Sequence, residues 1–337
     1  MQNMHHIVDD PVGDIVISVG AEGRLVRAHR NVLIMSSPIL KTLLAPPGRS
    51  HFGSMRHYTA NDPLLLLADV PDAFIDFCTI LHQQAVGPKE IPLHRLPDVA
   101  IVADKYGCAE RLRTVLASPF HSFFDNLEID SKTLEAAGVC PVATVCTAYA
   151  TGDVKLFARA TRWLLANKGH RELLAVPENS FIDILPPLIF LHMSMISQTA
   201  LDRLDYTACH EPVGDVYMQT PWHNPCRTAI ERIGLLSYHM CKIKHGEQMF
   251  RDTLMSLQEA WEAVSSVGEI VGPGSPLDGG CAEDMDDCST GGCTVDVKAM
   301  LDDAVQRSMD EVQGLCLPCL KAGSLAGLSS CECSIEY

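Results

Sequence analysis

The segment from residue 14 to residue 44 constrains the fold of this chain more than any other. It opens with the β-branched run Asp-Ile-Val-Ile-Ser-Val at 14–19, which predicts a strand, and a turn containing Gly23 leads to a return strand at 25–28. Residues 29–44 then carry apolar side chains at helical spacing. The Ser37-Pro38 pair divides this stretch, because serine favours a helix N-cap and proline the first helical position. The sequence therefore predicts a strand hairpin followed by a helical hairpin.

The next part of the chain adds one strand and three helices. The apolar run at 64–67 predicts a buried strand, and helical spacing predicts helices at 69–84, 93–106 and 109–120. A small sheet with helices segregated onto it is an α+β arrangement. Only helical patterns follow residue 131, so the sequence predicts an α+β domain and then an all-α region.

The residues of the first domain resemble the BTB/POZ family. That family has an aspartate before its first strand, Ala-His at the end of the second, a leucine four residues later and a serine before the next helix. The run Asp69-Val-Pro-Asp-Ala-Phe74 resembles the start of the family's third helix, and Ala103-Asp-Lys-Tyr-Gly-Cys108 resembles a later helix end. The resemblance covers most of residues 12–120 and implies a BTB/POZ fold, a small sheet with helical hairpins. The signature residues that it implies are Asp14, His29, Leu33, Ser36, Asp72, Phe74, Asp104 and Tyr106.

The chain beyond this domain resembles the filamentous-fungal BTB proteins. The likeness is carried by Ile80-Leu-His-Gln-Gln84 and by the run from Ala148 to Thr161. In such proteins a helical region follows, similar in position to the BACK helices of animal BTB proteins. The predicted divisions are a BTB/POZ domain at 12–120, a BACK-like region at 125–205, a linker at 206–224, and a helical, Cys-rich region at 225–337 with a mobile acidic loop at 268–292.

Charge and hydropathy narrow the classes of partner. The net charge is −16 and no run of Lys or Arg offers a cationic face for phosphates, so direct nucleic-acid binding is not expected. Residues 278–311 hold ten acids and two bases, either a solvated acidic face or an acidic docking segment. The start of the chain is not a secretory signal, and the most apolar stretch, 184–196, is shorter than the ~20 residues that a membrane span needs. We expect a buried helix there, no membrane contact, and a cytoplasmic or nuclear location.

A cysteine cluster near the end of the sequence suits a structural zinc ion. Two thiolates of Cys316-Leu-Pro-Cys319 can reach one tetrahedral ion from a tight turn, and Cys331-Glu-Cys333 follows at a suitable distance. Fungal BTB proteins carry a similar Gly-Leu-Cys-x-x-Cys followed by Cys-x-x-x-His, and Tyr337 stands where that histidine would be. Cys331 then serves as the fourth ligand, or Cys226 or Cys281 does. The alternative is a set of reduced, partly buried thiols, and no other cofactor is predicted.

The resemblance implies a protein that acts by binding other proteins. BTB domains dimerise, recruit cullin-3 ubiquitin ligases or bind corepressors. We expect a non-catalytic scaffold or adaptor, with a substrate adaptor of a cullin-3 ligase and a transcription-linked regulator that recruits corepressors as alternatives. No enzyme is expected, because no phosphate loop, Gly-x-Ser-x-Gly or His-Glu-x-x-His motif occurs, and His29 is expected to be structural.

Two details bear on how such a domain would bind. Only 13 residues precede Asp14, too few for the extra helix and strand of the family's swapped dimers, so no strand-swapped homodimer is expected. Cullin-3 binding uses a hydrophobic residue, any residue and then Glu, and the nearest match is Val70-Pro-Asp72, with Asp in place of Glu. Asp72 is equally suited to the first turn of a helix, where an acid stabilises the helix dipole by about 0.3–1 kcal/mol.

Overall fold

The computed structural model describes residues 5–6, 13–44, 58–83, 91–124, 131–168, 172–173, 184–186, 188–209, 256–271, 297–312 and 314–322. These residues fall into two compact units. The first holds the described residues up to Ala160 and residues 184–186, and the second holds the remaining ones from Thr161 onward. The division falls inside one helix, within the range that the sequence assigns to a single BACK-like region.

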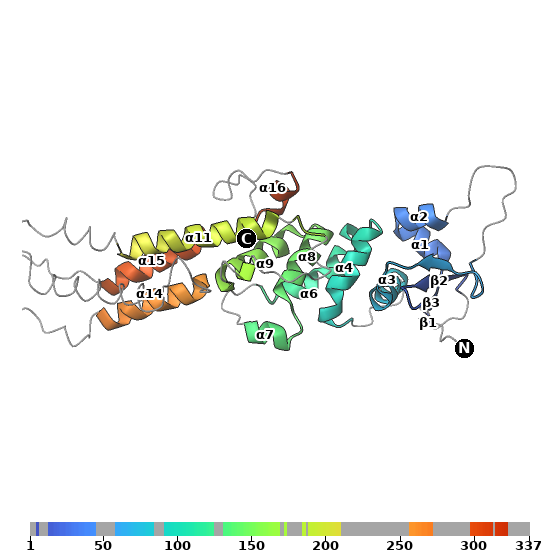
Figure 1. The fold of residues 1–337 in the computed structure, drawn as a ribbon, viewed down its shortest axis with the longest axis horizontal. Coiled ribbons are helices and arrows are strands. Elements are labelled where there is room, and N and C mark those ends of the chain that lie inside the picture. Colours follow the sequence, from blue (N-terminus) through green and yellow to red (C-terminus); the bar gives the residue numbers. More distant parts are fainter. Residues whose placement is uncertain are drawn as a thin grey trace, which may run out of the picture. The chain divides into compact units, whose positions relative to one another are not determined.

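The first unit contains a small sheet with strand order β1-β3-β2-β4 (Figure 1). Strands β2 (Ile15–Val19) and β3 (Arg24–Ala28) form the predicted antiparallel hairpin, and Gly23 in its turn has a left-handed φ of 67°. Strand β4 (Leu64–Leu66) runs parallel to β2 on its other side. Strand β1 (His5–His6) pairs in parallel with β3 of its own chain and was not predicted, because no apolar pattern marks it.

The prediction of a buried strand at 64–67 is wrong. Every residue of β2 is buried, but β4 lies at the edge of the sheet, and Leu65 and Leu67 are 60% and 62% exposed. An apolar run has the same composition in a central strand and in an edge strand, so only the pairing distinguishes them. The sequence therefore identified the strand but not its place in the sheet.

The helices of the first unit follow the predicted order. They are α1 (Arg30–Ser36), α2 (Pro38–Leu44), α3 (Pro71–Gln83), α4 (Leu96–Lys105) after the short 3-10 turn η1 (Leu93–Arg95), and the pieces η2 (Glu110–Leu112), α5 (Arg113–Leu116) and α6 (Ser118–His121). The predicted single helix at 109–120 is thus three short ones. Pro119 near the start of α6 lacks an N–H and cannot continue the preceding helix, a signal that was present in the sequence. The α+β class is confirmed.

Three further helices, α7 (Ser131–Ala136), α8 (Pro141–Thr151) and α9 (Val154–Asn167), continue the chain. Helix α8 packs against α4 and is buried almost all round. It ends in a Schellman motif, in which Gly152 has a φ of 69° and the Asp153 N–H donates to the Ala148 carbonyl at 2.9 Å. The Asp153 carboxylate then accepts the Leu156 N–H at 2.9 Å, so Asp153 is the N-cap of α9.

The second unit contains α11 (Leu188–Cys209), α14 (Leu257–Val271), α15 (Val297–Glu311) and α16 (Leu317–Lys321). Helices α11, α14 and α15 lie side by side (Figure 1), and the buried Trp261 indole N–H donates to Ser308 Oγ at 3.1 Å between α14 and α15. The described residues from 131 onward form helices and no strand, as predicted. No described helix combines the length and apolar character that crossing a membrane requires.

Three element bounds in the second unit differ from the sequence predictions. Helix α11 continues through residues 206–209, the start of the predicted linker, and α14 continues to Val271, inside the predicted acidic loop. The remainder of the linker at 210–224 and of the loop at 272–292 lies outside the described residues. The stretch 184–196, predicted as a buried helix, is buried on one face only, since Leu191 and Met195 of α11 are 45% and 56% exposed.

The left-handed residue at the α8–α9 corner provides a test of this fold. Gly152→Ala should lower the free energy of unfolding by about 1–2 kcal/mol, because a Cβ disfavours the left-handed region. Chemical denaturation measures this change. The control is Lys155→Ala, an exposed substitution three residues away, which should stay within about 0.5 kcal/mol of the parent protein. Equal stabilities of the two variants would contradict the assigned conformation.

Candidate functional site

Asp14 joins the sheet to the α1–α2 hairpin. Its Oδ1 atom accepts the Arg30 N–H at 2.7 Å, which satisfies a backbone donor in the first turn of α1. The buried Arg30 side chain donates to the Leu44 carbonyl at 3.2 Å, at the end of α2. Leu33, on the inner face of α1, is fully buried. These contacts give both signature residues, Asp14 and Leu33, a structural role.

The backbone N–H of His29 forms a hydrogen bond with the side chain of a second histidine, His82. The His29 N–H donates to His82 Nε2 at 3.0 Å, and His82 Nδ1 lies 2.7 Å from the Cys78 carbonyl oxygen, to which it donates. Both bonds require a neutral His82 ring. Burial lowers the pKa of His82, partly offset by the hydrogen bond to Cys78, and nearby His29 lowers it further. No local pattern marks His82 as important, because His29, whose N–H it accepts, lies far away in the chain.

Ser37, and not the signature residue Ser36, caps α2. Its hydroxyl oxygen accepts the Leu40 N–H at 3.0 Å and donates to the Tyr106 carbonyl at 2.6 Å. Ser36 is the last residue of α1. The sequence places Ser37 at the N-cap from its position before Pro38, and that prediction is confirmed. The serine that directly precedes α2 is therefore Ser37, and the family role of Ser36 stays a prediction.

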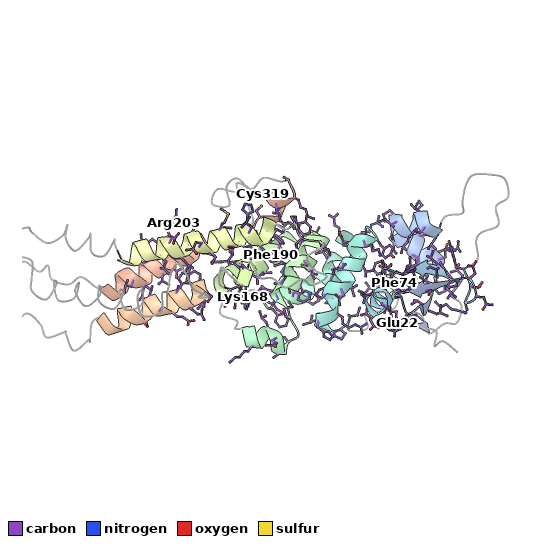
Figure 2. All side chains as sticks on the ribbon, in the orientation of Figure 1. Glu22, Phe74, Lys168, Phe190, Arg203 and Cys319 are labelled. Carbon is purple, nitrogen blue, oxygen red and sulfur yellow. The ribbon has the colours of Figure 1, made fainter. Side chains whose placement is uncertain are left out.

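A buried carboxylate holds the end of α4. Asp69 is 6% exposed, and it accepts hydrogen bonds from Lys105 Nζ at 2.7 Å and from the Tyr106 hydroxyl at 2.6 Å. The Tyr106 ring stacks on Phe77 and meets the edge of Phe74, with ring centroids 5.7 and 5.8 Å apart (Figure 2 labels Phe74). Burial, and then the hydrogen bond and charge of Asp69, raise the pKa of Tyr106. Phe74 and Tyr106 therefore belong to the core.

The two remaining signature residues, Asp72 and Asp104, lie at the surface. Asp72 is in the first turn of α3, where its carboxylate forms an ion pair with Arg24 of β3. Its carbonyl oxygen also accepts a hydrogen bond from Arg95 at 3.3 Å. Asp104 is exposed near the end of α4. Of the signature residues, these two carboxylates are the ones best placed to meet a partner.

Most of the large apolar side chains that are exposed on the first unit come from two segments of the chain. Met35, Ile39 and Leu43 of the α1–α2 hairpin are 80%, 41% and 44% exposed, and we call them the hairpin patch. Leu65, Leu67 and Val70, which we call the β4 strip, are 60%, 62% and 58% exposed. The hairpin patch adjoins η2, because the Arg111 guanidinium donates to the Met35 carbonyl at 3.4 Å. Exposed apolar side chains mark an interaction surface where they form a large contiguous patch.

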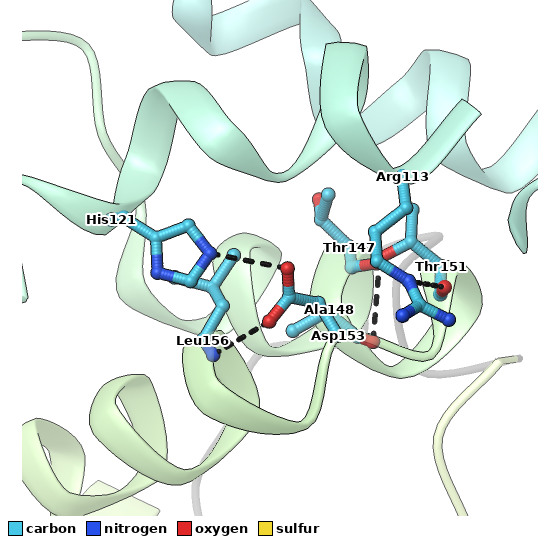
Figure 3. Close-up of polar contacts among 7 residues, drawn as sticks. All are labelled: Arg113, His121, Thr147, Ala148, Thr151, Asp153 and Leu156. Atoms are coloured by element: carbon cyan, nitrogen blue, oxygen red, sulfur yellow. Dashed lines mark hydrogen bonds and ion pairs between the residues drawn. The ribbon is translucent and has the colours of Figure 1, made fainter. Parts of the chain in front are cut away.

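The corner between α8 and α9 is held by side chains of α5 and α6 (Figure 3). Arg113 Nε donates to the Thr151 carbonyl at 3.0 Å, which satisfies an acceptor at the end of α8. His121 Nε2 lies 3.1 Å from Asp153 Oδ2, the carboxylate that also caps α9. The predicted domain end at residue 120 therefore falls inside a connected set of polar contacts.

Two of the six cysteines considered as zinc ligands fall in the described part of the chain. Cys316 is the N-cap of α16 and is buried, and Cys319, labelled in Figure 2, is partly exposed. The Leu315 N–H, next to Cys316, donates to Thr161 Oγ1 at 2.8 Å. Cys331, Cys333, Cys226 and Cys281 lie outside the described residues. Within the described residues no three His, Cys, Asp or Glu side chains are grouped to hold a metal ion, and the zinc site stays a prediction.

Comparison with known proteins adds no relative. No protein-family model matches the chain. Searches of the curated proteins and of the solved structures likewise returned no match. The likeness to BTB/POZ domains therefore depends on the residues quoted above.

The neutral state of His82 leads to a pH-dependent prediction. The unfolded chain takes up a proton on this residue more readily than the folded protein, because the folded-state pKa is the lower one. The contribution of His82 to stability is therefore present above the ordinary pKa of 6.5 and is lost as the pH falls below it. His82→Gln should cost about 1 kcal/mol at neutral pH, and the difference from the parent protein should shrink in acid.

Urea unfolding of both proteins across this pH range measures the difference. The control is Asn31→Gln, an exposed and non-titrating change whose free-energy difference has no reason to vary with pH. A His82→Gln difference that stays constant with pH would refute the assigned protonation state.

Proposed function

We propose that the first unit contains a BTB/POZ-type interaction domain and that the chain is a non-catalytic scaffold or adaptor. The order of the elements supports the proposal, with β2 between an antiparallel and a parallel neighbour and helical hairpins around it. The roles of Asp14, Leu33 and Tyr106 in holding those elements support it as well. A domain of this kind contributes a binding surface, so the surface residues decide what it does.

The hairpin patch is the observation that carries this proposal. Its three side chains are absent from the core, and fully burying a Met, Ile or Leu side chain is worth about 1.5–3 kcal/mol. The hairpin that presents them is rigid, since Asp14 fixes its start, Ser37 its middle and Arg30 its end. A preorganised apolar surface loses little conformational entropy on binding. We therefore assign the hairpin patch as the surface through which the domain holds a partner protein.

Replacing one residue of the hairpin patch tests this assignment. Ile39→Glu should weaken capture of the bound partner at least tenfold, because tenfold in affinity is about 1.4 kcal/mol and a buried charge costs more. Quantitative affinity purification with mass spectrometry compares full-length parent and variant. Leu191→Glu is the matched control, since it makes the same change at a similarly exposed leucine of α11. A partner set that Ile39→Glu leaves unchanged would overturn the assignment.

A second candidate function, a cullin-3 ligase adaptor, is favoured by the exposure of Val70 and Asp72. Both residues are accessible at the start of α3, where the sequence places the nearest match to the family's cullin contact motif. Asp72 also pairs with Arg24, so its loss would disturb the surface of the domain as well as any contact. A test of this candidate has to separate those two effects.

A charge exchange separates them. If the parent protein binds cullin-3 through Asp72, Asp72→Arg should abolish that binding, measured by co-precipitation. Arg24→Asp combined with Asp72→Arg restores an ion pair of reversed sense, and binding should stay absent. Recovery of binding in the double variant would show a structural role for Asp72, and a parent protein that does not bind cullin-3 would eliminate this candidate.

A further inference from the structure

We propose that the thioether of Met35 is a reversible oxidation site, at which a peroxide converts an apolar contact of the hairpin patch into a polar sulfoxide. The consequence for binding rests on the proposed function, because it requires that the hairpin patch holds a partner. The oxidation itself does not, since it depends on the exposure and the chemistry of one side chain. Separate measurements therefore test the two parts.

The Met35 side chain is open to solvent. Met35, near the end of α1, is 80% exposed, the largest value for any large apolar residue that the structure describes. Two methionines of α11 provide a comparison, because Met195 is 56% exposed and Met193 is fully buried. A thioether is oxidised only where the oxidant reaches it. We therefore expect Met35 and Met195 to react with a peroxide far more readily than Met193.

Three of the described thiols compete little for the oxidant. Cys78, Cys108 and Cys146 are buried, and burial raises the pKa of Cys108 to about 11 and the pKa of Cys146 to about 12. These thiols stay protonated at neutral pH, whereas the thiolate is the form that reacts with a peroxide. Cys140 is exposed and Cys319 is partly exposed, so a test has to separate thiol oxidation from thioether oxidation.

The reaction is a two-electron transfer of oxygen. The thioether sulfur attacks one oxygen of hydrogen peroxide, the S–O bond forms as the O–O bond breaks, and the other oxygen leaves as water. A methionine sulfoxide reductase regenerates the thioether with two electrons from a dithiol, and the sulfoxide oxygen leaves as water. The modification is therefore reversible, and a dithiol alone does not reverse it at a useful rate.

The sulfoxide changes the surface and not the fold. The backbone around Met35 is held by contacts that do not involve its side chain, since its carbonyl accepts the Arg111 guanidinium at 3.4 Å and the Ser37 N–H donates to the Leu33 carbonyl at 3.0 Å. A sulfoxide oxygen is a hydrogen-bond acceptor, and burial against an apolar partner surface leaves it without a donor. Oxidation of Met35 should therefore weaken partner binding at least tenfold while the domain stays folded.

The first measurement follows the oxidation of the full-length protein by hydrogen peroxide, using peptide mass spectrometry. Met35 should form the sulfoxide at least tenfold faster than the buried Met193, and Met195 supplies an exposed reference on another helix. Circular dichroism should show an unchanged fold when Met35 is fully oxidised. A Met35 rate close to that of Met193 would eliminate the oxidation site, and unfolding on oxidation would show that Met35 supports the core instead.

The second measurement compares partner capture before and after peroxide treatment of the purified full-length protein, with the peroxide removed before a cell lysate is added. Capture by the parent protein should fall at least tenfold. It should return after treatment with methionine sulfoxide reductase and dithiothreitol, but not with dithiothreitol alone. For Met35→Leu, which has an apolar side chain of similar volume and no sulfur, the ratio of the two captures should be close to one. Met195→Leu is the matched control and should respond to peroxide as the parent protein does.

The other outcomes assign the failure to one part. Recovery with dithiothreitol alone attributes the loss of capture to cysteines, and a Met35→Leu protein that stays sensitive to peroxide attributes it to another residue, so either eliminates Met35 as the controlling site. Capture that Ile39→Glu abolishes but Met35 oxidation leaves intact overturns the switch and keeps the proposed function. Capture that Ile39→Glu leaves unchanged overturns the proposed function, and the oxidation rates still decide whether Met35 is an oxidation site.

Discussion

The buried carboxylate of Asp69 determines the arrangement around it. It lies between β4 and α3, and a charge at this depth is stable only because Lys105 and Tyr106 both donate to it. The Asp69 N–H also donates to the Leu66 carbonyl, which closes the turn after β4. This one residue thus ties the end of the edge strand to the end of α4. The outward direction of the β4 strip and the start of α3 both follow from its position.

The local sequence pattern was enough to predict most helices and strands of the first unit, but not which distant residues they contact. The strand hairpin and the Ser37 cap follow from neighbouring residues, and the structure has both as the sequence predicts. Asp69 and His82 depend on residues far away in the chain, and no periodicity marks such pairs. The edge position of β4 was missed for the same reason, because burial of an apolar run is decided by pairing and not by composition.

The helical region packs against the α+β domain more closely than the predicted domain end at residue 120 suggests. Helix α8 packs on α4, and Arg113 and His121 hold the corner that follows α8. A chain cut near residue 120 would leave the α8-facing surface of α4 and these polar groups without their partners. The hairpin patch and the β4 strip are thus presented by a unit that extends through the α8–α9 corner to Ala160.

The three buried threonines of α8 determine what this helix requires from the helices around it. Thr144, Thr147 and Thr151 each return their hydroxyl to a carbonyl one turn earlier, at 3.0, 2.9 and 2.7 Å. Their polar groups are satisfied within the helix, so the neighbouring helices meet mainly methyl groups. The hydroxyl groups of these threonines therefore need no polar partner on the neighbouring helices. A valine at any of these positions would keep nearly the same side-chain shape and would remove only a hydroxyl group that is bonded within the helix.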